Sequence, residues 1–237
     1  MQNINERIQR LNWMVITDSM HQKGYARVTS LLSREECDSL RETFSNDSLF
    51  RKTIVMERYR FGKGVYKYYQ YPLPGLVDAI RKGMYTFLAP IANKWATVLN
   101  LKEGFPDNWS ELQQRCIDHD QIWPTVLILQ YHQEGFNTLH QDLYGEVFFP
   151  IQIVLFLNEP GLEYEGGEFV LTEQVPRAQS KAIVLKPSLG DMLIFTTNFR
   201  PVKGTRGYYK ANMKHGVSEV TKGTRTTLGI IFHDAKS

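Results

Sequence analysis

The sequence has little cysteine and no long apolar run, and each absence excludes a class of protein. Only Cys37 and Cys116 occur among the 237 residues, without a Cys-x-x-Cys spacing, so no disulfide framework is expected and a reducing cytoplasm is the predicted location. No segment approaches the roughly 20 apolar residues of a membrane span. The start, MQNINERIQRLNWM, lacks the apolar core of a signal peptide. No membrane association is therefore expected.

The net charge is also small, at +3, so it gives no global argument for nucleic-acid binding. A hydrophobic fraction of 42% is that of a globular protein. The length suits a single domain, and no repeat or linker divides it. We predict one domain over residues 1–237, with mostly helical support and substrate-rim segments in 1–123 and a catalytic core in 124–237.

The first part of the chain carries signals of helices. Ser33 and Glu36 form a capping-box pattern, and residues 76–98 carry an apolar stripe with helical spacing. Pro90 is expected to break or kink that helix. A third helix is predicted to follow Asn108. Its inward-facing residues should be Leu112, Cys116 and Ile117.

From Pro124 onward the pattern is that of short strands, punctuated by Gly, Pro and Asn. The predicted strands cover residues 126–131, 148–157, 169–172, 182–185, 192–196 and 226–232. Many short strands after a helical opening favour an α+β protein that is mainly β. The expected core is a double-stranded β-helix, the cupin-like jelly roll, with N-terminal helices packed on one side.

The strongest signal for chemistry is His140-Gln141-Asp142, followed by an isolated His215. Two imidazoles and one carboxylate form the facial triad that holds non-heme Fe(II) and leaves positions open. On an extended strand, residues two apart project to one face, so His140 and Asp142 can reach one metal while Gln141 points away. Any single histidine is more often structural, and only one of the six begins a His-x-Asp. The ordered combination with Arg225 makes the metal site the better interpretation.

Several segments from Tyr131 to Ala235 resemble the Fe(II)/2-oxoglutarate dioxygenases, on the prolyl-hydroxylase-like branch. The matching pieces are Tyr131 before Gly135, His140-Gln-Asp142, Gly166-Gly167-Glu168-Phe169, Pro187-Ser-Leu-Gly190-Asp191, His215-Gly216-Val217, Gly223 and Arg225. The strings HQDLYGEVFFPIQ, GGEFVLTEQVPR and RTTLGIIFHDA are similar to a bacterial subfamily catalogued as a probable nucleic-acid oxygenase. The resemblance implies Fe(II), 2-oxoglutarate and O2 as cofactor and co-substrates. It also implies hydroxylation of a second substrate with release of succinate and CO2.

The resemblance also implies a co-substrate site. Arg225 is the candidate for the distal carboxylate of 2-oxoglutarate, because a charge entering the apolar strand TLGIIF needs a partner. Prolyl hydroxylases generally have lysine at this place, and the alternative is a surface ion pair. Thr227 lies on the same strand face and could join that carboxylate. Tyr131 is a further candidate ligand or a structural tyrosine, and Tyr144 is expected to line the substrate pocket.

Two basic stretches are candidates for the substrate rim. Residues 51–70 contain six Lys/Arg, one acid and five aromatics, and residues 198–214 contain five Lys/Arg and no acid. Cations for phosphates and rings for bases are what a flexible nucleic-acid strand needs, although solvated loops are also rich in lysine and arginine. The two stretches are predicted to form one rim above the iron. Its arginines would be Arg58, Arg60, Arg200 and Arg206.

These patterns leave the second substrate open. A nucleic-acid oxygenase that removes N-alkyl groups is one hypothesis, and a protein or peptidyl-prolyl hydroxylase is another. A small-molecule hydroxylase also remains. A non-catalytic jelly-roll binding module is disfavoured by the complete triad and Arg225. The sequence does not indicate the oligomeric state.

Overall fold

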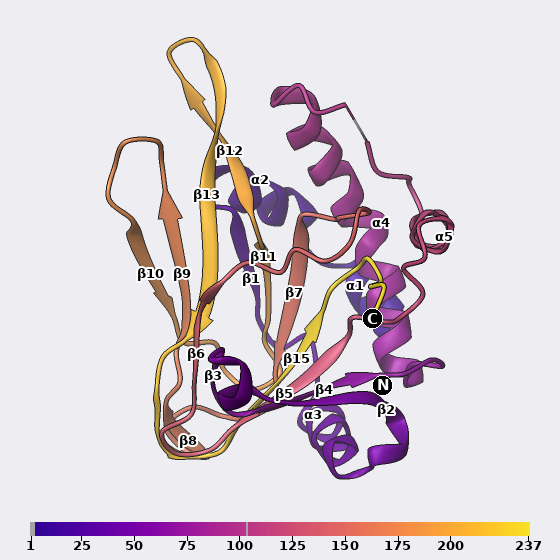
Figure 1. Cartoon of the computed structure of the whole chain (residues 1–237), viewed down its shortest axis with the longest axis vertical. Helices are drawn as coiled ribbons and strands as arrows, with labels where there is room; N and C mark the ends of the chain where they lie inside the picture. The colour runs from indigo at the N-terminus through magenta and orange to yellow at the C-terminus, as the bar shows by residue number, and fades with distance from the viewer. Residues whose placement is uncertain (1–2, 103) are drawn as a thin grey trace.

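Two large β-sheets, a small two-stranded sheet of β8 and β14, and a set of helices make up the structure, a computed structural model that describes residues 3–102 and 104–237. In Figure 1, α1, α4 and α5 lie on the right, α2 lies behind the strands in the upper middle, and α3 lies at the bottom. The sheet of seven strands runs through the middle and the second large sheet stands on the left. The strand orders are β1-β11-β7-β15-β5-β4-β2 and β10-β9-β13-β6-β3, with β12 paired to β13. The solved structures described below share this jelly-roll fold, so the predicted fold class is confirmed.

Helices form where the capping and spacing signals predicted them. The helices are α1 (Ile4–Gln9), α2 (Trp13–Lys23), α3 (Arg34–Glu42), α4 (Gly75–Val98) and α5 (Trp109–Asp118), with 3-10 turns η1 (Thr43–Ser45), η2 (Asp47–Leu49) and η3 (Met56–Tyr59). The capping box of Ser33 and Glu36 is present at the start of α3, and Asn108 caps α5. The part of the chain described here has no helix with the length and apolarity needed to cross a membrane.

Two details of the helix prediction differ from the structure. Pro90 does not break the helix, one of its two predicted effects, because α4 continues through it as one helix. Proline removes one backbone donor, but burial of the surrounding face, including Ala89 and Ile91, outweighs that loss. Ile117 is 45% exposed rather than inward, since only Leu112 and Cys116 of the expected set face the core.

The strands follow the predicted order in the second half of the chain. They are β1 (Tyr25–Val28), β2 (Phe50–Val55), β3 (Gly62–Lys63), β4 (Val65–Tyr69), β5 (Leu127–Tyr131), β6 (Phe136–His140), β7 (Ile151–Phe156), β8 (Tyr164–Gly166), β9 (Phe169–Gln174), β10 (Lys181–Leu185), β11 (Met192–Thr196), β12 (Phe199–Gly204), β13 (Gly207–Val217), β14 (Val220–Gly223) and β15 (Arg225–Ile230). All six predicted strands are confirmed, as β5, β7, β9, β10, β11 and β15.

Both basic stretches contain strands that the sequence did not predict. Residues 51–70 contribute most of β2, all of β3 and β4, and so extend both sheets with chain from the helical half. Residues 198–214 were expected to form a loop, but they form the β12–β13 hairpin. The next residue of β13 is the candidate metal ligand His215. The lysines of the hairpin alternate with buried residues such as Ala211 and Met213, so the stretch has a strand's period of two.

The strand β7 separates the two parts of the core. Ile151, Ile153 and Leu155 belong to the large cluster shared with the helices, whereas Val154 and Phe156 pack between the sheets against β9, β11 and β13. Side chains alternate across a strand, so each sheet face has its own core. The interior between the sheets is where the candidate site lies.

Candidate metal and co-substrate site

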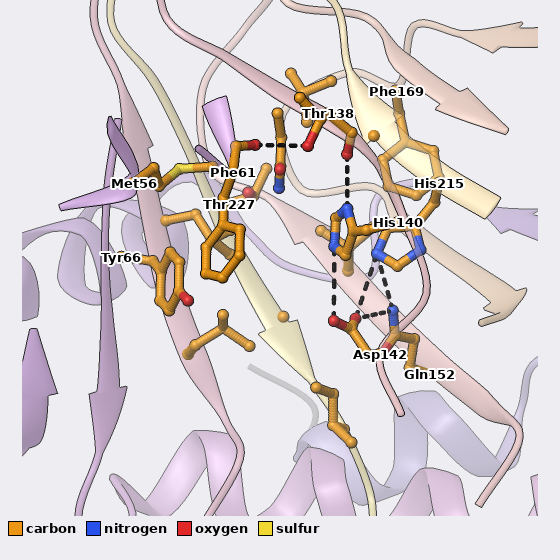
Figure 2. Close-up of a pocket in the computed structure, with 18 of the residues that line it drawn as sticks. Met56, Phe61, Tyr66, Thr138, His140, Asp142, Gln152, Phe169, His215 and Thr227 are labelled. Atoms are coloured by element: carbon orange, nitrogen blue, oxygen red, sulfur yellow. Dashed lines mark hydrogen bonds and ion pairs between the residues drawn. The ribbon is translucent and has the colours of Figure 1, made fainter. Parts of the chain in front are cut away.

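The three predicted metal ligands lie together on or just after two neighbouring inner strands of the second sheet, β6 and β13. His140 is the last residue of β6, and His215 is its directly opposed partner on β13. Asp142 follows in the loop after β6. One ligand atom from each residue lies within 4.8 Å of the others, and this is the one such cluster among the residues that the structure describes. Figure 2 shows the three side chains converging from two segments far apart in sequence.

Hydrogen bonds hold the Asp142 carboxylate in place. The Nε2 atom of His215 lies 3.3 Å from Oδ2, and Nε2 of His140 lies 3.5 Å from Oδ1. Gln152 on β7 donates to Oδ2 at 2.9 Å, and Tyr144 donates to Oδ1 at 3.0 Å. Each carboxylate oxygen therefore has one donor from outside the triad, which fixes the plane that it presents.

The protonation states suit a divalent cation. Burial alone would raise the pKa of Asp142, but the hydrogen bond from His215 and the contact with His140 hold it well below its usual range. Burial lowers the pKa of His215. A carboxylate and neutral imidazoles are the forms that bind metal, so the donor set fits Fe(II).

Two glutamines near the triad have different tasks. Gln141 points away as predicted, and its amide donates to the carbonyls of Asn198 and Met213, which anchors the loop to β13. Gln152 was missed by the sequence analysis. Its signal was a single polar residue inside the buried apolar strand IQIVLF, where an amide needs a partner.

A cavity of about 260 Å³ opens beside the triad. Its walls are largely aromatic and aliphatic, and they come from η3, β4–β7, β9, β11, β13 and β15, with Phe61 just before β3. Four tyrosines line it, namely Tyr66, Tyr68, Tyr131 and Tyr144. In Figure 2, Tyr66 and Phe61 stand across the cavity from Asp142. The chain therefore provides a small chamber with mostly apolar walls next to the metal-ligand candidates.

Arg225 lies inside this cavity and not at the surface. It starts β15 opposite Tyr131 on β5 and is 1% exposed. Its Nη1 donates to the hydroxyl of Thr227 at 3.4 Å, while Nε and Nη2 have no partner within residues 3–102 and 104–237. No carboxylate of the described chain pairs with it. Buried cations require an anion, so the residues present fit a carboxylate ligand such as that of 2-oxoglutarate.

Tyr131 presents a neutral phenol to the same space. Burial raises its pKa to about 12, and its oxygen accepts a hydrogen bond from Asn137 at 3.3 Å. Its proton is then available to a ligand in the cavity. The ring lies 5.5 Å from the guanidinium of Arg225, measured from Cζ to the ring centroid.

Gly166 and Gly167, at the end of β8, make room for this arginine. Both glycines have positive φ, at 70° and 62°. A Cβ on Gly167 would lie 2.8 Å from Cδ of Arg225, so a side chain there would collide with it. The carboxylate of Glu168 accepts a hydrogen bond from the hydroxyl of Ser218. This contact links the residue before β9 to the residue after β13 and is structural.

The expected arginine rim does not form. Arg58 and Arg60 are exposed at η3, whereas Arg206 lies in the turn of the β12–β13 hairpin. Arg200 pairs with Glu173 on β9. In Figure 1, β3, which follows η3, lies at the opposite end of the sheet from the hairpin tip, and none of the four arginines lines the cavity. Of the expected rim residues, only Tyr144 does.

Two other histidines near the motifs, His132 and His233, lie outside the ligand set. His132 is exposed and its Nδ1 contacts the hydroxyl of Thr224. His233 is buried, accepts from the backbone of Phe149, and has a pKa lowered by burial to about 3. Neither points at the triad.

Comparison with known proteins gives a family and a fold. A family model described as "Oxygenase, catalysing oxidative methylation of damaged DNA" matches residues 64–235. An uncharacterised protein of Mycobacterium tuberculosis is 33% identical over 227 residues, which cover 96% of this chain and 92% of that protein.

Solved structures share the fold at low identity. A Pseudomonas putida prolyl-4-hydroxylase aligns with a TM-score of 0.57 at 13% identity, over 94% of this chain and 100% of that one. The viral collagen prolyl hydroxylase of Paramecium bursaria Chlorella virus-1, solved with 2-oxoglutarate, aligns with a TM-score of 0.51 at 17% identity, over 87% and 94%. At such identities the likeness shows the fold and not the substrate.

Proposed function

Because the chain belongs to the oxygenase family described as acting on damaged DNA and is a Fe(II)/2-oxoglutarate-dependent dioxygenase, we propose the following roles for its site residues. His140, Asp142 and His215 hold Fe(II). Arg225 binds the distal carboxylate of 2-oxoglutarate, and Thr227 joins it. The observation that carries this assignment is the shared cavity, because metal-ligand atoms and an arginine with unpaired donors face the same chamber.

Each residue then has a physical task. Bound iron with 2-oxoglutarate and O2 supplies the oxidation that hydroxylates a C–H bond, with succinate and CO2 released. Arg225 neutralises the co-substrate and fixes its direction in a dry pocket. Tyr131 donates a hydrogen bond to it. Gln152 and Tyr144 keep the Asp142 carboxylate oriented toward the metal.

For the second substrate we propose an alkylated base in nucleic acid. Hydroxylation inserts one oxygen atom into the C–H bond next to nitrogen, and the product then loses the alkyl group as an aldehyde when the C–N bond breaks. The family description supports a damaged nucleic acid. The small aromatic cavity suits a base taken out of its stack.

A test measures succinate formation with purified protein and a panel of alkylated oligonucleotides, proline peptides and amino acids. We expect slow turnover of 2-oxoglutarate alone and stimulation by an alkylated oligonucleotide. Asp142→Ala should abolish both and lower the bound iron from one equivalent. The matched control is Glu165→Ala, which removes an exposed carboxylate on β8 and should behave like wild type. Full turnover by Asp142→Ala would refute the metal assignment, and stimulation by a proline peptide alone would replace the nucleic-acid substrate with a protein.

A further inference from the structure

A second hollow of about 690 Å³ lies beyond the loop that carries Asp142. The loop between β6 and β7 contributes to both spaces, since Asp142 and Tyr144 line the iron-site cavity and Val147 and Phe148 line this hollow. Its other walls are the end of α4, the connection to α5, and the β12–β13 hairpin. A bound chain could therefore occupy both spaces by crossing one loop.

Among the described residues, three cations without an acidic partner line the hollow. Lys102, Arg115 and Lys210 line it, and Glu146, the one acid among its described lining residues, is paired with Lys236 at 2.8 Å. No ion pair involves the three cations within the described ranges 3–102 and 104–237. In a chain of net charge +3, this gathers positive potential on one surface.

The positive lining continues into an adjoining space. A hollow of about 440 Å³ shares Trp95 with the first and is lined by Lys94 and Lys203. Like the three cations above, these lysines are in no ion pair of the described chain. The helix dipole accounts for neither lysine, because the last turn of α4 contains no basic residue and Lys203 is on the hairpin.

Aromatic rings lie among these cations. Phe105, Phe148 and Phe199 line the larger hollow, and the ammonium of Lys210 stands 4.4 Å from the Phe199 ring centroid. Tyr208, 47% exposed, lines the smaller one. Proteins bind single strands through cations for the phosphates and rings for unpaired bases. A paired duplex would not offer base faces to rings set in a recess.

We propose that the hollow between α4 and the β12–β13 hairpin binds the phosphodiester backbone of a single nucleic-acid strand, next to the nucleotide whose base enters the iron-site cavity. This inference rests on the proposed function for its substrate class. It gives the hairpin a role as one wall of the strand-binding surface. It also moves that surface away from Arg58 and Arg60, to the other side of the Asp142 loop.

The test compares two double charge reversals in the full-length chain. Lys102→Glu with Lys210→Glu changes the hollow, and Lys181→Glu with Lys222→Glu is the matched control on exposed positions of β10 and β14. Binding of a fluorescein-labelled single-stranded oligonucleotide is followed by anisotropy at several salt concentrations. The hollow variant should bind at least about tenfold more weakly at low salt, and its salt slope should fall by about 1.4, the value for two phosphate contacts on a single strand. The control should stay within about twofold of wild type.

Turnover of 2-oxoglutarate without a second substrate separates the two claims. It should be equal in all three proteins, because neither pair touches the triad or Arg225. Three results would refute the proposed strand-binding surface while leaving the oxygenase assignment intact. They are an equal loss of oligonucleotide binding in both variants, no loss in either variant, and no binding by wild type. Oligonucleotide binding that depends on the hollow, in a protein without 2-oxoglutarate turnover, would keep the surface and refute the proposed function.

Discussion

Replacing Arg225 with methionine should stabilise the ligand-free protein and abolish its stabilisation by 2-oxoglutarate. The wild-type guanidinium is buried, with Nε and Nη2 unpaired and one long contact to Thr227. Further compensation comes from the rings of Tyr131 and Phe156, at 5.5 and 5.4 Å, and from Tyr164 and Glu168 nearby, and none of these supplies a paired carboxylate. A residue kept in that state is costly to the fold and is explained by a ligand.

The two effects have opposite signs, and their sizes can be estimated. Replacing buried charges with apolar groups of similar volume is often neutral or stabilising by about 1–4 kcal/mol. The two ring contacts are long, at 5.5 and 5.4 Å, so we take the low end of about 0.5–1 kcal/mol each; their loss reduces the gain by about 1–2 kcal/mol and leaves a central expectation of about 1 kcal/mol. One kcal/mol moves the melting temperature by about 2–4 °C in a chain of this length. Loss of the carboxylate contact should weaken 2-oxoglutarate by about 2–5 kcal/mol, or about 30- to 4,000-fold.

The assay is thermal unfolding with Mn(II), with and without 2-oxoglutarate. Wild type should gain about 2.7 kcal/mol at a hundred times its Kd. Arg225→Met should begin at an equal or higher melting temperature and gain almost nothing. Arg225→Lys is the control, because it keeps the charge and should retain part of the shift. A lower ligand-free melting temperature combined with an intact 2-oxoglutarate shift would show that Arg225 is structural, and the reasoning would fail.

Three further predictions concern other buried groups. Gln152→Leu removes a donor from Asp142 and should weaken Co(II) binding about 10–100-fold, as followed by the cobalt absorption bands; unchanged affinity would exclude the positioning role. Asp234→Ala leaves fully buried Arg81 without its carboxylate and should cost about 3–5 kcal/mol in urea unfolding, whereas a cost below about 1 kcal/mol would contradict the pairing. Burial raises the pKa of the Cys37 thiol to about 12, so iodoacetamide at pH 8 should label it only after unfolding; rapid labelling of the native protein would argue against that burial.

Local patterns were sufficient for much of the fold because the strands of the second half are apolar and separated by turn residues. The convergence of His140 and Asp142 also followed from a period-two argument, although Asp142 proved to lie just past the end of β6. The partnership of His215 with His140 is a property of the β6–β13 pairing, which the sequence indicates only through the resemblance.

The failures have a common physical cause. The β12–β13 hairpin carries lysines, tyrosines and glycines that are typical of loops, and its strand character depends on pairing with β9 and β6. The prediction of a rim of four arginines assumed that two basic segments lie close together in space. The sheet topology instead places η3 and the hairpin turn apart. Gln152 needed the opposite reasoning, because a polar side chain in a buried strand becomes informative once its face is known.

The two halves of the iron-site cavity are held by very different amounts of backbone pairing. His140 is on β6, which lies between a two-residue strand, β3, and an irregular stretch of β13. Arg225 is on β15, which pairs on both sides, with β5 and β7, inside the seven-stranded sheet. Local opening is easiest where few backbone bonds must break, so amide exchange should be fast along β6 and slow along β15. The metal-ligand side of the cavity should therefore open locally before the co-substrate wall does.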